Sequence, residues 1–254
     1  MDKKKSIAAI REELHQLTSD QLEAFMAAHG TDERAGVKKL VASAKKQLEN
    51  YRKELNRIEE IRYYENTYAG YGAICGIDEV GRGPLAGPVV AGAVILPPDC
   101  RILYINDSKK LTAAKREELY DLIMAEAVAV GIGLVPQNVI DEINILQATY
   151  QAMRQAIGNL SVQPDLLLND AVTIPGVDIP QVPIIKGDAR SISIGAASIV
   201  AKVYRDRMMV EYDRMFPGYG FASNKGYGSR EHMEALKRLG PCPIHRRSFI
   251  KGIV

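Results

Sequence analysis

The segment before about residue 66 carries the pattern of apolar and polar positions that is typical of helices. It is dense in Lys, Glu, Gln and Ala and contains almost no β-branched runs. Thr18 with Gln21, or Asp20 with Glu23, has the spacing of a capping box at a helix start. We therefore expect three helices, from Ser6 to Leu17, from Thr18-Ser19-Asp20 to His29-Gly30, and from just after Thr31-Asp32 to about Tyr64.

The third predicted helix carries a heptad-like apolar seam whose spacings alternate between four and three. Its members are Val37, Val41, Ala44, Leu48, Tyr51, Leu55 and Ile58. This pattern favours packing of the seam against the first two helices. The alternative is a projecting arm that contacts a partner or a substrate.

The pattern changes near residue 66, and from Ile74 onward short apolar runs alternate with amphipathic ones. Gly/Pro-rich turns separate the first two runs, which favours antiparallel pairing there, and the later strands alternate with helices. We expect strands at 74–78, 88–96, 101–105, 131–135, 165–169 and 181–185, and helices at 112–128, 145–157 and 189–215. The chain is thus predicted to hold a helical domain over residues 1–66 and, over residues 72–254, an α/β domain with a mixed sheet and a C-terminal helical segment.

The amino-acid composition excludes several classes of protein but does not indicate a function. The 254 residues are 46% hydrophobic and 25% charged, with a net charge of +2, which is typical of a globular protein and reveals no partner. No apolar stretch approaches the roughly 18 residues that span a bilayer. The basic start resembles a signal peptide, but Arg11, Glu12 and Glu13 interrupt any apolar middle. Three scattered cysteines favour a reducing compartment, so we expect a cytoplasmic protein without membrane association.

Four acidic side chains lie at or just beyond the ends of predicted strands. Asp78 and Glu79 close the first strand, Asp170 follows an apolar run, and Asp188 follows the strand at 181–185. Ligands bind at this edge of open α/β sheets. Clustered carboxylates repel one another and stay ionised only beside a cation, and with no His or Cys among them the donors favour Mg²⁺ or Mn²⁺. Two such ions, about 4 Å apart, would activate water for phosphodiester hydrolysis.

The alternative for each acid is a structural cap of a helix or a turn. Consecutive Asp78 and Glu79 also cannot both face one ion from a regular strand, because side chains alternate. One of them is therefore expected to use a kink, a backbone carbonyl or a position behind the ion's ligands.

A glycine-rich turn follows directly, Gly81-Arg82-Gly83-Pro84-Leu85-Ala86-Gly87-Pro88. Its glycines let the backbone approach a ligand closely, and Arg82 can fork onto a phosphate. By pattern alone, a structural turn is the default.

The amino-acid residues of several motifs resemble those of ribonuclease HII, the type 2 ribonuclease H family. These motifs are Ile77-Asp78-Glu79-Val80-Gly81-Arg82-Gly83-Pro84-Leu85-Ala86-Gly87-Pro88, Asn106-Asp107-Ser108-Lys109-Lys110-Leu111, Lys186-Gly187-Asp188, Ala196-Ala197-Ser198-Ile199-Val200-Ala201-Lys202-Val203 with Arg205-Asp206, Lys225-Gly226-Tyr227-Gly228 and His245-Arg246-Arg247-Ser248-Phe249. They occur in order over roughly residues 72–250. The Gly-Arg-Gly triplet resembles the HII branch rather than the HIII branch.

The resemblance implies an RNase H-like α/β fold and a metal-dependent endonuclease. Such an enzyme cuts the RNA strand of RNA/DNA hybrids and cuts 5′ to ribonucleotides embedded in duplex DNA, leaving 3′-hydroxyl and 5′-phosphate ends. It also implies that Asp78, Glu79, Asp170 and Asp188 are the catalytic, metal-binding acids, that Gly81-Arg82-Gly83 recognises the ribose 2′-hydroxyl, and that Tyr227 stacks on a deoxyribose. Two positions depart from the family pattern: Asp170 precedes Ala171 rather than glycine, and Asn224 stands where many members carry histidine.

Other candidate substrate contacts are read against simpler structural roles. Lys109 is a phosphate contact or half of a solvated pair, and Ser198 contacts phosphate or merely allows close helix–sheet packing. Tyr227 is either a sugar platform or a core aromatic. Lys225 opens a C-terminal segment with seven basic and two acidic side chains, a local excess of about +5 that suits a nucleic acid. His232 and His245 have no partner at metal-ligand spacing.

The leading hypothesis is therefore an endonuclease that acts on RNA/DNA hybrid and on ribonucleotide-containing duplex DNA, as a monomer. One alternative is a catalytically inert RNase H-like scaffold that binds hybrids, and another is a structure-specific DNA nuclease. The helical domain is expected to strengthen hybrid binding. Because its basic and acidic residues nearly balance, they predict no obvious basic face, and a stabilising or protein-contact role is the alternative.

Overall fold

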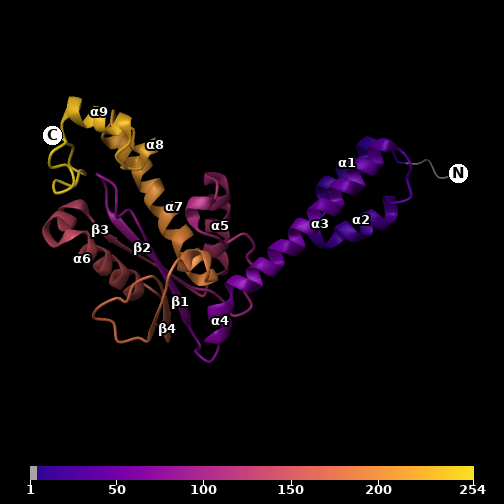
Figure 1. Cartoon of the computed structure of the whole chain (residues 1–254), viewed down its shortest axis with the longest axis horizontal. Helices are drawn as coiled ribbons and strands as arrows, with labels where there is room; N and C mark the ends of the chain where they lie inside the picture. The colour runs from indigo at the N-terminus through magenta and orange to yellow at the C-terminus, as the bar shows by residue number, and fades with distance from the viewer. Residues whose placement is uncertain (1–4) are drawn as a thin grey trace. The chain divides into compact units, whose positions relative to one another are not determined.

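The structure is a computed structural model that describes residues 5–254 (Figure 1). The chain divides into two compact units, Met1–Glu59 and Glu60–Val254. This division falls within a long helix, earlier than the change of composition near residue 66.

The first unit is a small helical assembly with its own apolar core. It contains α1 (Ile7–Gln16), a 3₁₀ turn (Ser19–Gln21), α2 (Leu22–His29) and most of α3 (Ala35–Ile61). The Ser6 hydroxyl accepts a hydrogen bond from the Ala9 N–H and caps α1, and Thr18 with Gln21 forms the predicted capping box. The seam residues Val37, Ala44 and Leu48 are buried among side chains of α1 and α2. The prediction that the seam packs on the first two helices is confirmed from Val37 to Tyr51, whereas Leu55 is 39% exposed and Ile58 lies outside this core.

The second unit is a five-stranded mixed sheet with helices on both faces (Figure 1). Its strands are β1 (Ile74–Val80), β2 (Val89–Ile95), β3 (Ala129–Val135), β4 (Leu166–Asp170) and β5 (Gln181–Ile184). Their order is β3-β2-β1-β4-β5, with β1, β2 and β3 antiparallel and with β4 and β5 parallel to β1. The predicted α/β class with a mixed sheet is confirmed.

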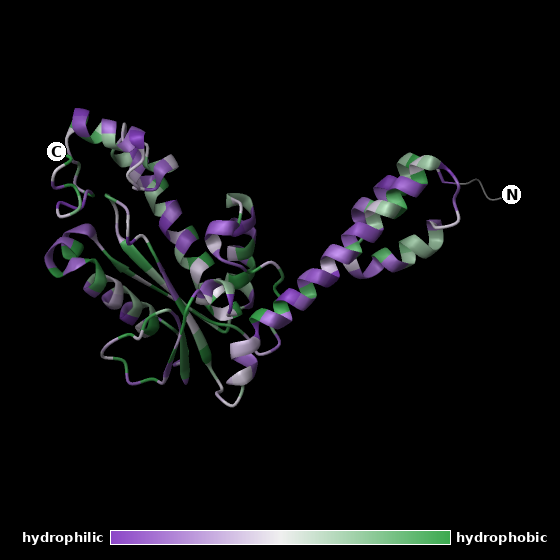
Figure 2. Ribbon diagram, in the orientation of Figure 1, coloured by the Kyte–Doolittle hydropathy of each residue, from purple (hydrophilic) through white to green (hydrophobic). Residues whose placement is uncertain are grey.

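The helices of the second unit are α4 (Tyr63–Thr67), α5 (Ala113–Glu126), α6 (Gln137–Gly158), α7 (Ile192–Met215), α8 (Phe221–Asn224) and α9 (Arg230–Leu239). Figure 2 shows that apolar residues gather on the strands, whereas hydrophilic ones dominate α9. In the described part of the chain, no helix is long and apolar enough to cross a membrane.

Glycines set the spacing between the sheet and its two main helices. A Cβ atom on Gly76 would lie 2.0 Å from the Ser193 carbonyl carbon of α7, and one on Gly133 would lie 1.9 Å from the Ala152 oxygen of α6. Because strand residues alternate between faces and Ala91 pairs with Gly133, the α7 face carries Gly76 and Asp78 while the α6 face carries Ala91. The helix backbones thus contact the strands directly.

Two expected elements differ from those observed. The predicted strand at 101–105 is wrong: this segment is a loop in which Ile102 and Ile105 are buried and Tyr104 has a left-handed φ of 68°. Both edges of β2 are already paired, so no neighbouring edge is free to receive it. The helix predicted from Ile145 is the second half of α6, and it starts there because Asn144 leaves helical geometry and accepts hydrogen bonds from the N–H groups of Leu146 and Gln147.

Candidate active site

Parallel pairing brings the predicted acids to one edge of the sheet. Ile77 of β1 lies opposite Asn169 of β4, so Asp78 and Asp170 are neighbours on adjacent strands. Asp170 ends β4 opposite Ile184 of β5. Asp188 lies four residues further along, in a 3₁₀ turn over Gly187–Ala189. The carboxyl ends of three parallel strands therefore carry the acids.

Asp78 is the most enclosed of the four, with 7% of its surface exposed. Burial raises its pKa well above the ordinary value, and the neighbouring charge of Glu79 raises it further. A hydrogen bond from the Ser198 hydroxyl acts in the opposite direction. The hydroxyl oxygens of Ser198 and Ser108 are 3.0 Å apart, and both residues are buried. The structure thus places Ser198 behind Asp78, within the protein.

Glu79 comes from the other face of the strand but lies near its end. Its Oε1 is 3.5 Å from the Arg82 guanidinium, whose side chain is 45% exposed. Burial raises the pKa of Glu79, the charge of Arg82 lowers it and that of Asp170 raises it. Strand alternation separates Asp78 and Glu79 as expected, yet both remain within electrostatic reach of Asp170.

Asp170 and Asp188 are joined by the turn between them. Asp170 Oδ1 accepts a hydrogen bond of 2.7 Å from the Gly187 N–H. Burial raises the pKa of Asp188, and the carboxylates of Asp107 and Asp170 raise it further. Lys109 faces the same group: partial burial would lower its pKa, but the charges of Asp78, Asp107 and Asp188 outweigh this and raise it. The predicted Lys109 therefore lies among the acids.

This donor set fits hard divalent cations. Carboxylate oxygens are preferred by Mg²⁺ and Mn²⁺. Burial and mutual repulsion together raise the pKa values of Asp78 and Asp188, and the charge of Lys109 offsets only part of this effect. Within residues 5–254, no three His, Cys, Asp or Glu side chains already lie close enough together to enclose an ion. The acids are neighbours that a cation would still have to draw together.

Two buried guanidinium groups donate hydrogen bonds to the main-chain carbonyls of the glycine-rich turn. Arg246 donates to the carbonyls of Gly81, Arg82 and Gly87 at 2.6, 2.9 and 2.9 Å. Arg205 donates to those of Pro88, Ala86 and Lys225 at 2.9, 3.1 and 2.9 Å. Burial lowers the pKa of Arg246 to about 9, and the charge of Arg205 contributes. Gly81 has a φ of 90°, and a Cβ atom there would lie 2.3 Å from Arg205 Nε.

These contacts fix the direction of the peptide groups in the turn. In a trans peptide the carbonyl and the next N–H point in opposite directions. Because the carbonyls of Gly81 and Arg82 point at Arg246, the N–H groups of Arg82 and Gly83 point away from the protein interior. Neither N–H has an acceptor within the described part of the chain. The turn presents two adjacent, unused donors.

Tyr227 lies beside this turn. It is 43% exposed, and a Cβ atom on Gly83 would lie 3.8 Å from its Cε1 atom. Asn224, at the position where many family members carry histidine, accepts a hydrogen bond of 2.8 Å from the Gly226 N–H and so shapes the same loop. Lys225 turns its amine back to the Ala222 carbonyl of that loop.

Sequence reasoning missed three residues that shape the site. It did not assign a role to Asp107, which lies against Asp188, or to the buried Arg205 and Arg246. All three lie in the quoted motifs, but a charged side chain is expected on the surface unless its partners are known. Nothing in the spacing of Arg246 relates it to a turn so much earlier in the chain.

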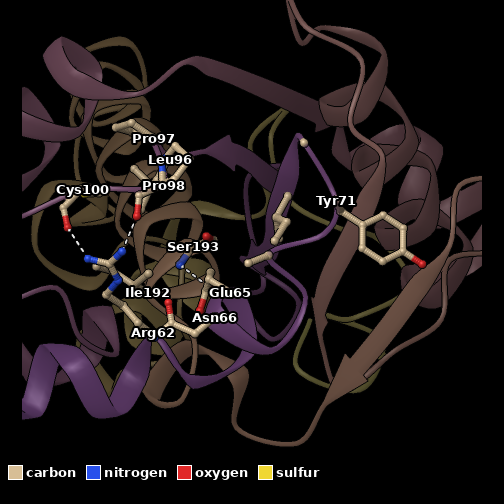
Figure 3. A pocket seen from close by; sticks show the side chains of 13 residues that line it. Arg62, Glu65, Asn66, Tyr71, Leu96, Pro97, Pro98, Cys100, Ile192 and Ser193 are labelled. Atoms are coloured by element: carbon tan, nitrogen blue, oxygen red, sulfur yellow. Dashed lines mark hydrogen bonds between the residues drawn. The ribbon is translucent and has the colours of Figure 1, made fainter.

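A separate pocket of about 100 Å³ contains none of the four acids (Figure 3). Arg62 donates there to the carbonyls of Cys100 and Pro98, and Glu65 accepts the Ser193 N–H. The Arg62 contacts attach the start of α4 to the loop after β2, and the Glu65 contact attaches α4 to the start of α7. The acids themselves lie outside this pocket, at the carboxyl ends of β1 and β4 and in the turn after β5.

Comparisons with known proteins agree with this geometry. Residues 75–252 match the ribonuclease HII family, and residues 6–69 match the ribonuclease HII N-terminal domain. A ribonuclease HII of Lachnoclostridium phytofermentans is 68% identical over 225 residues, covering 89% of each chain. One from Clostridioides difficile is 52% identical over 252 residues, covering 98% of this chain and 99% of the relative.

Solved structures give the same fold. The ribonuclease H2 of Pyrococcus horikoshii OT3 is 28% identical with a TM-score of 0.60, covering 71% of this chain and 96% of the other. A Bst-RNase HIII in complex with Mn²⁺ shares the fold at 16% identity, with a TM-score of 0.51, over 66% of this chain and 61% of that chain. With both of its parts matched and with relatives aligned over nearly its whole length, the chain belongs to the ribonuclease HII family of ribonuclease H endonucleases.

Proposed function

We propose that this endonuclease cuts the RNA strand of RNA/DNA hybrids and cuts 5′ to ribonucleotides embedded in duplex DNA, leaving 3′-hydroxyl and 5′-phosphate ends. The observation that carries the proposal is the juxtaposition of acids with a turn that presents free N–H donors. The catalytically inert alternative is not favoured, because all four acids are present and the curated relatives are named as ribonucleases.

Asp78, Glu79, Asp170 and Asp188 would hold two divalent ions, Mg²⁺ or Mn²⁺. When bound, such ions activate water and stabilise the leaving oxygen of the phosphodiester. The protein's part is to hold these donors in place. Ser198 orients Asp78, the Gly187 N–H orients Asp170, and Lys109 offsets part of the negative charge.

The outward N–H groups of Arg82 and Gly83 would donate to the 2′-oxygen of the ribonucleotide. Only this hydroxyl distinguishes RNA from DNA at a single position. Tyr227, exposed beside Gly83, would stack on the neighbouring sugar, and Arg82 and Lys109 would contact phosphates. Lys225 would contribute through the charge of its loop.

A panel of labelled duplexes tests the substrate. We expect cleavage of duplexes with one or four ribonucleotides and none of an all-DNA duplex. A 2′-O-methyl group at the single ribonucleotide should abolish cleavage there, because it crowds the two N–H donors and removes the hydroxyl proton. Denaturing gels give the cut position and the end chemistry. Equal cutting of the all-DNA duplex would reject ribose recognition.

The helical unit is proposed to strengthen binding to the duplex. Although its charges nearly balance overall, basic pairs recur with a heptad period along α3, and one heptad is about 10 Å of helix. All six side chains are exposed, with Glu49 as the acid between the second and third pairs. They are Lys38, Lys39, Lys45, Lys46, Arg52 and Lys53, hereafter the α3 basic stripe.

Replacing the six residues of the α3 basic stripe with glutamine should weaken hybrid binding and flatten its salt dependence. Each lost phosphate contact lowers the slope of log K against log salt by about 0.9. Fluorescence anisotropy at several salt concentrations measures this. A control with arginine at the five lysines keeps the charge and should keep the slope. An unchanged slope in the glutamine variant would assign the stripe another role.

We further propose that the enzyme works as a monomer in the cytoplasm. Its three cysteines are free and buried, which suits a reducing compartment.

A further inference from the structure

The main chain of Tyr227 is held by a histidine of α9. The Tyr227 carbonyl accepts hydrogen bonds from the Ser229 N–H and from His232 Nδ1, both at 2.8 Å. Since this residue lies beside Gly83, the direction of its carbonyl helps to set where its ring stands against the turn.

His232 is the middle of a longer chain of contacts. Its Nε2 lies 3.0 Å from Nε2 of His245, and His245 Nδ1 lies 3.0 Å from the Cys242 main-chain nitrogen. His232 is fully buried and His245 is 1% exposed. The rings of Tyr219 and Phe221 pack against both imidazoles. Hydrogen bonds, not water, therefore satisfy these nitrogens.

The donors and acceptors allow one arrangement of protons. The Cys242 N–H can only donate, so His245 Nδ1 accepts and its proton sits on Nε2. That proton is donated to His232 Nε2, so the His232 proton sits on Nδ1 and is donated to the Tyr227 carbonyl. Both rings are neutral. Burial lowers the pKa of both, that of His245 to about 4.

The same contacts argue against a metal site. The Cys242 sulfur lies 3.1 Å from His245 Nδ1, whereas His232 lies at Nε2 on the opposite edge of that ring. One ion cannot reach all three groups.

The segment that carries His245 is itself held in place by hydrogen bonds. Asp141 accepts hydrogen bonds from the N–H groups of Arg247 and Ser248, and Gln137 donates to the Pro243 carbonyl. His245 is followed by Arg246, which holds Gly81 and Arg82. Two consecutive residues of one anchored segment therefore reach both halves of the proposed sugar site.

We propose that His245 and His232 are positioning residues, a neutral imidazole pair that sets the place of Tyr227 relative to the Gly81–Gly83 turn. The proposal rests on the proposed role of Tyr227 in contacting sugar. Neither histidine touches the substrate.

Two variants of His232 separate positioning from folding. Asn places an amide nitrogen where Nδ1 stands and keeps the donor to Tyr227, whereas Gln reaches toward His245 and leaves Tyr227 without it. We expect His232→Gln to raise KM for a single-ribonucleotide duplex about tenfold, within the range of one stacking contact, with kcat little changed. His232→Asn should stay near wild type. If the loss of activity in the two variants instead parallels their loss of thermal stability, the proposal would be overturned.

A double-mutant cycle with Tyr227→Ala completes the test. If His232 acts through Tyr227, His232→Gln should cost nothing further in the Tyr227→Ala background. An equal loss in both backgrounds would overturn the proposal.

The imidazole pair can also be measured without substrate. Nitrogen-15 NMR of the histidine rings at pH 7 should show His245 protonated at Nε2 and His232 at Nδ1. Opposite tautomers, or a charged ring, would overturn the proposal. If the tautomers hold and His232→Gln shifts the Tyr227 ring signals, yet Tyr227→Ala cleaves normally, the positioning of Tyr227 stands and its assigned role in contacting sugar fails.

Discussion

Replacing Asp170 with asparagine is expected to lower kcat by about 10³-fold or more while hybrid binding persists. Metal-assisted hydrolysis draws on charge stabilisation, and a loss of about 1.4 kcal/mol there is tenfold in rate. Asparagine keeps an oxygen that can accept the Gly187 N–H at the position of Oδ1, so the turn toward Asp188 is preserved. Single-turnover cleavage and anisotropy binding separate the two effects. Asp188→Asn is likewise expected to lower kcat while hybrid binding persists.

Asp165→Asn is the matched control for Asp170→Asn. Asp165 precedes β4 at its opposite end, where Oδ2 accepts the Ala73 N–H. The same loss of one charge there should leave kcat unchanged. Should Asp170→Asn cleave at the wild-type rate, the assignment of the acids to catalysis would be wrong.

Arg246→Met is expected to lower the free energy of unfolding by about 3–5 kcal/mol. The change leaves the buried carbonyls of Gly81 and Gly87 and the carbonyl of Arg82 without donors, and it removes the contact of the guanidinium with the Phe249 ring. Relief of a buried cation offsets only part of this cost. Chemical denaturation measures it, and kcat/KM for ribonucleotide duplexes should fall as well because the turn loses its support.

Arg247→Met provides the comparison. Arg247 is exposed, and its structural contact runs through its main-chain N–H to Asp141, which methionine preserves. Its stability should change by no more than about 0.5 kcal/mol. Two neighbouring arginines would thus differ sharply, and equal stability of both variants would contradict the role given to Arg246.

The fold class and the place of the acids follow from local patterns. Alternating strands and helices predict the mixed sheet, and acids at strand ends predict the edge where Asp78 and Asp170 become neighbours. The family resemblance adds the glycine turn and Tyr227, whose roles stay predictions. What the pattern could not supply depends on contacts between distant segments. The loop at 101–105 depends on β2 having no free edge, and the burial of Arg246 depends on a turn far away in sequence.

The same holds for the helical unit. Charge counting over this whole segment hides the α3 basic stripe, because acids elsewhere in the segment cancel the sum. Two of these acids, Glu33 and Glu23, pair with Lys38 and Arg52 of the stripe, and its other four side chains form no ion pair within the described residues. Its buried seam was readable because packing residues repeat at fixed spacing.

The glycines between the sheet and the helices are positions at which this protein can accept few substitutions. Gly76 lies under α7 two residues before Asp78, and α7 also carries Ser198, whose hydroxyl acts to lower the pKa of that carboxyl. Any side chain at position 76 would have to push the helix outward and take the serine with it. A mutation that never reaches the reacting phosphate would therefore impair catalysis. The residues tolerated at position 76 over evolutionary time should be limited by the space between β1 and α7, not by any chemical role of the side chain.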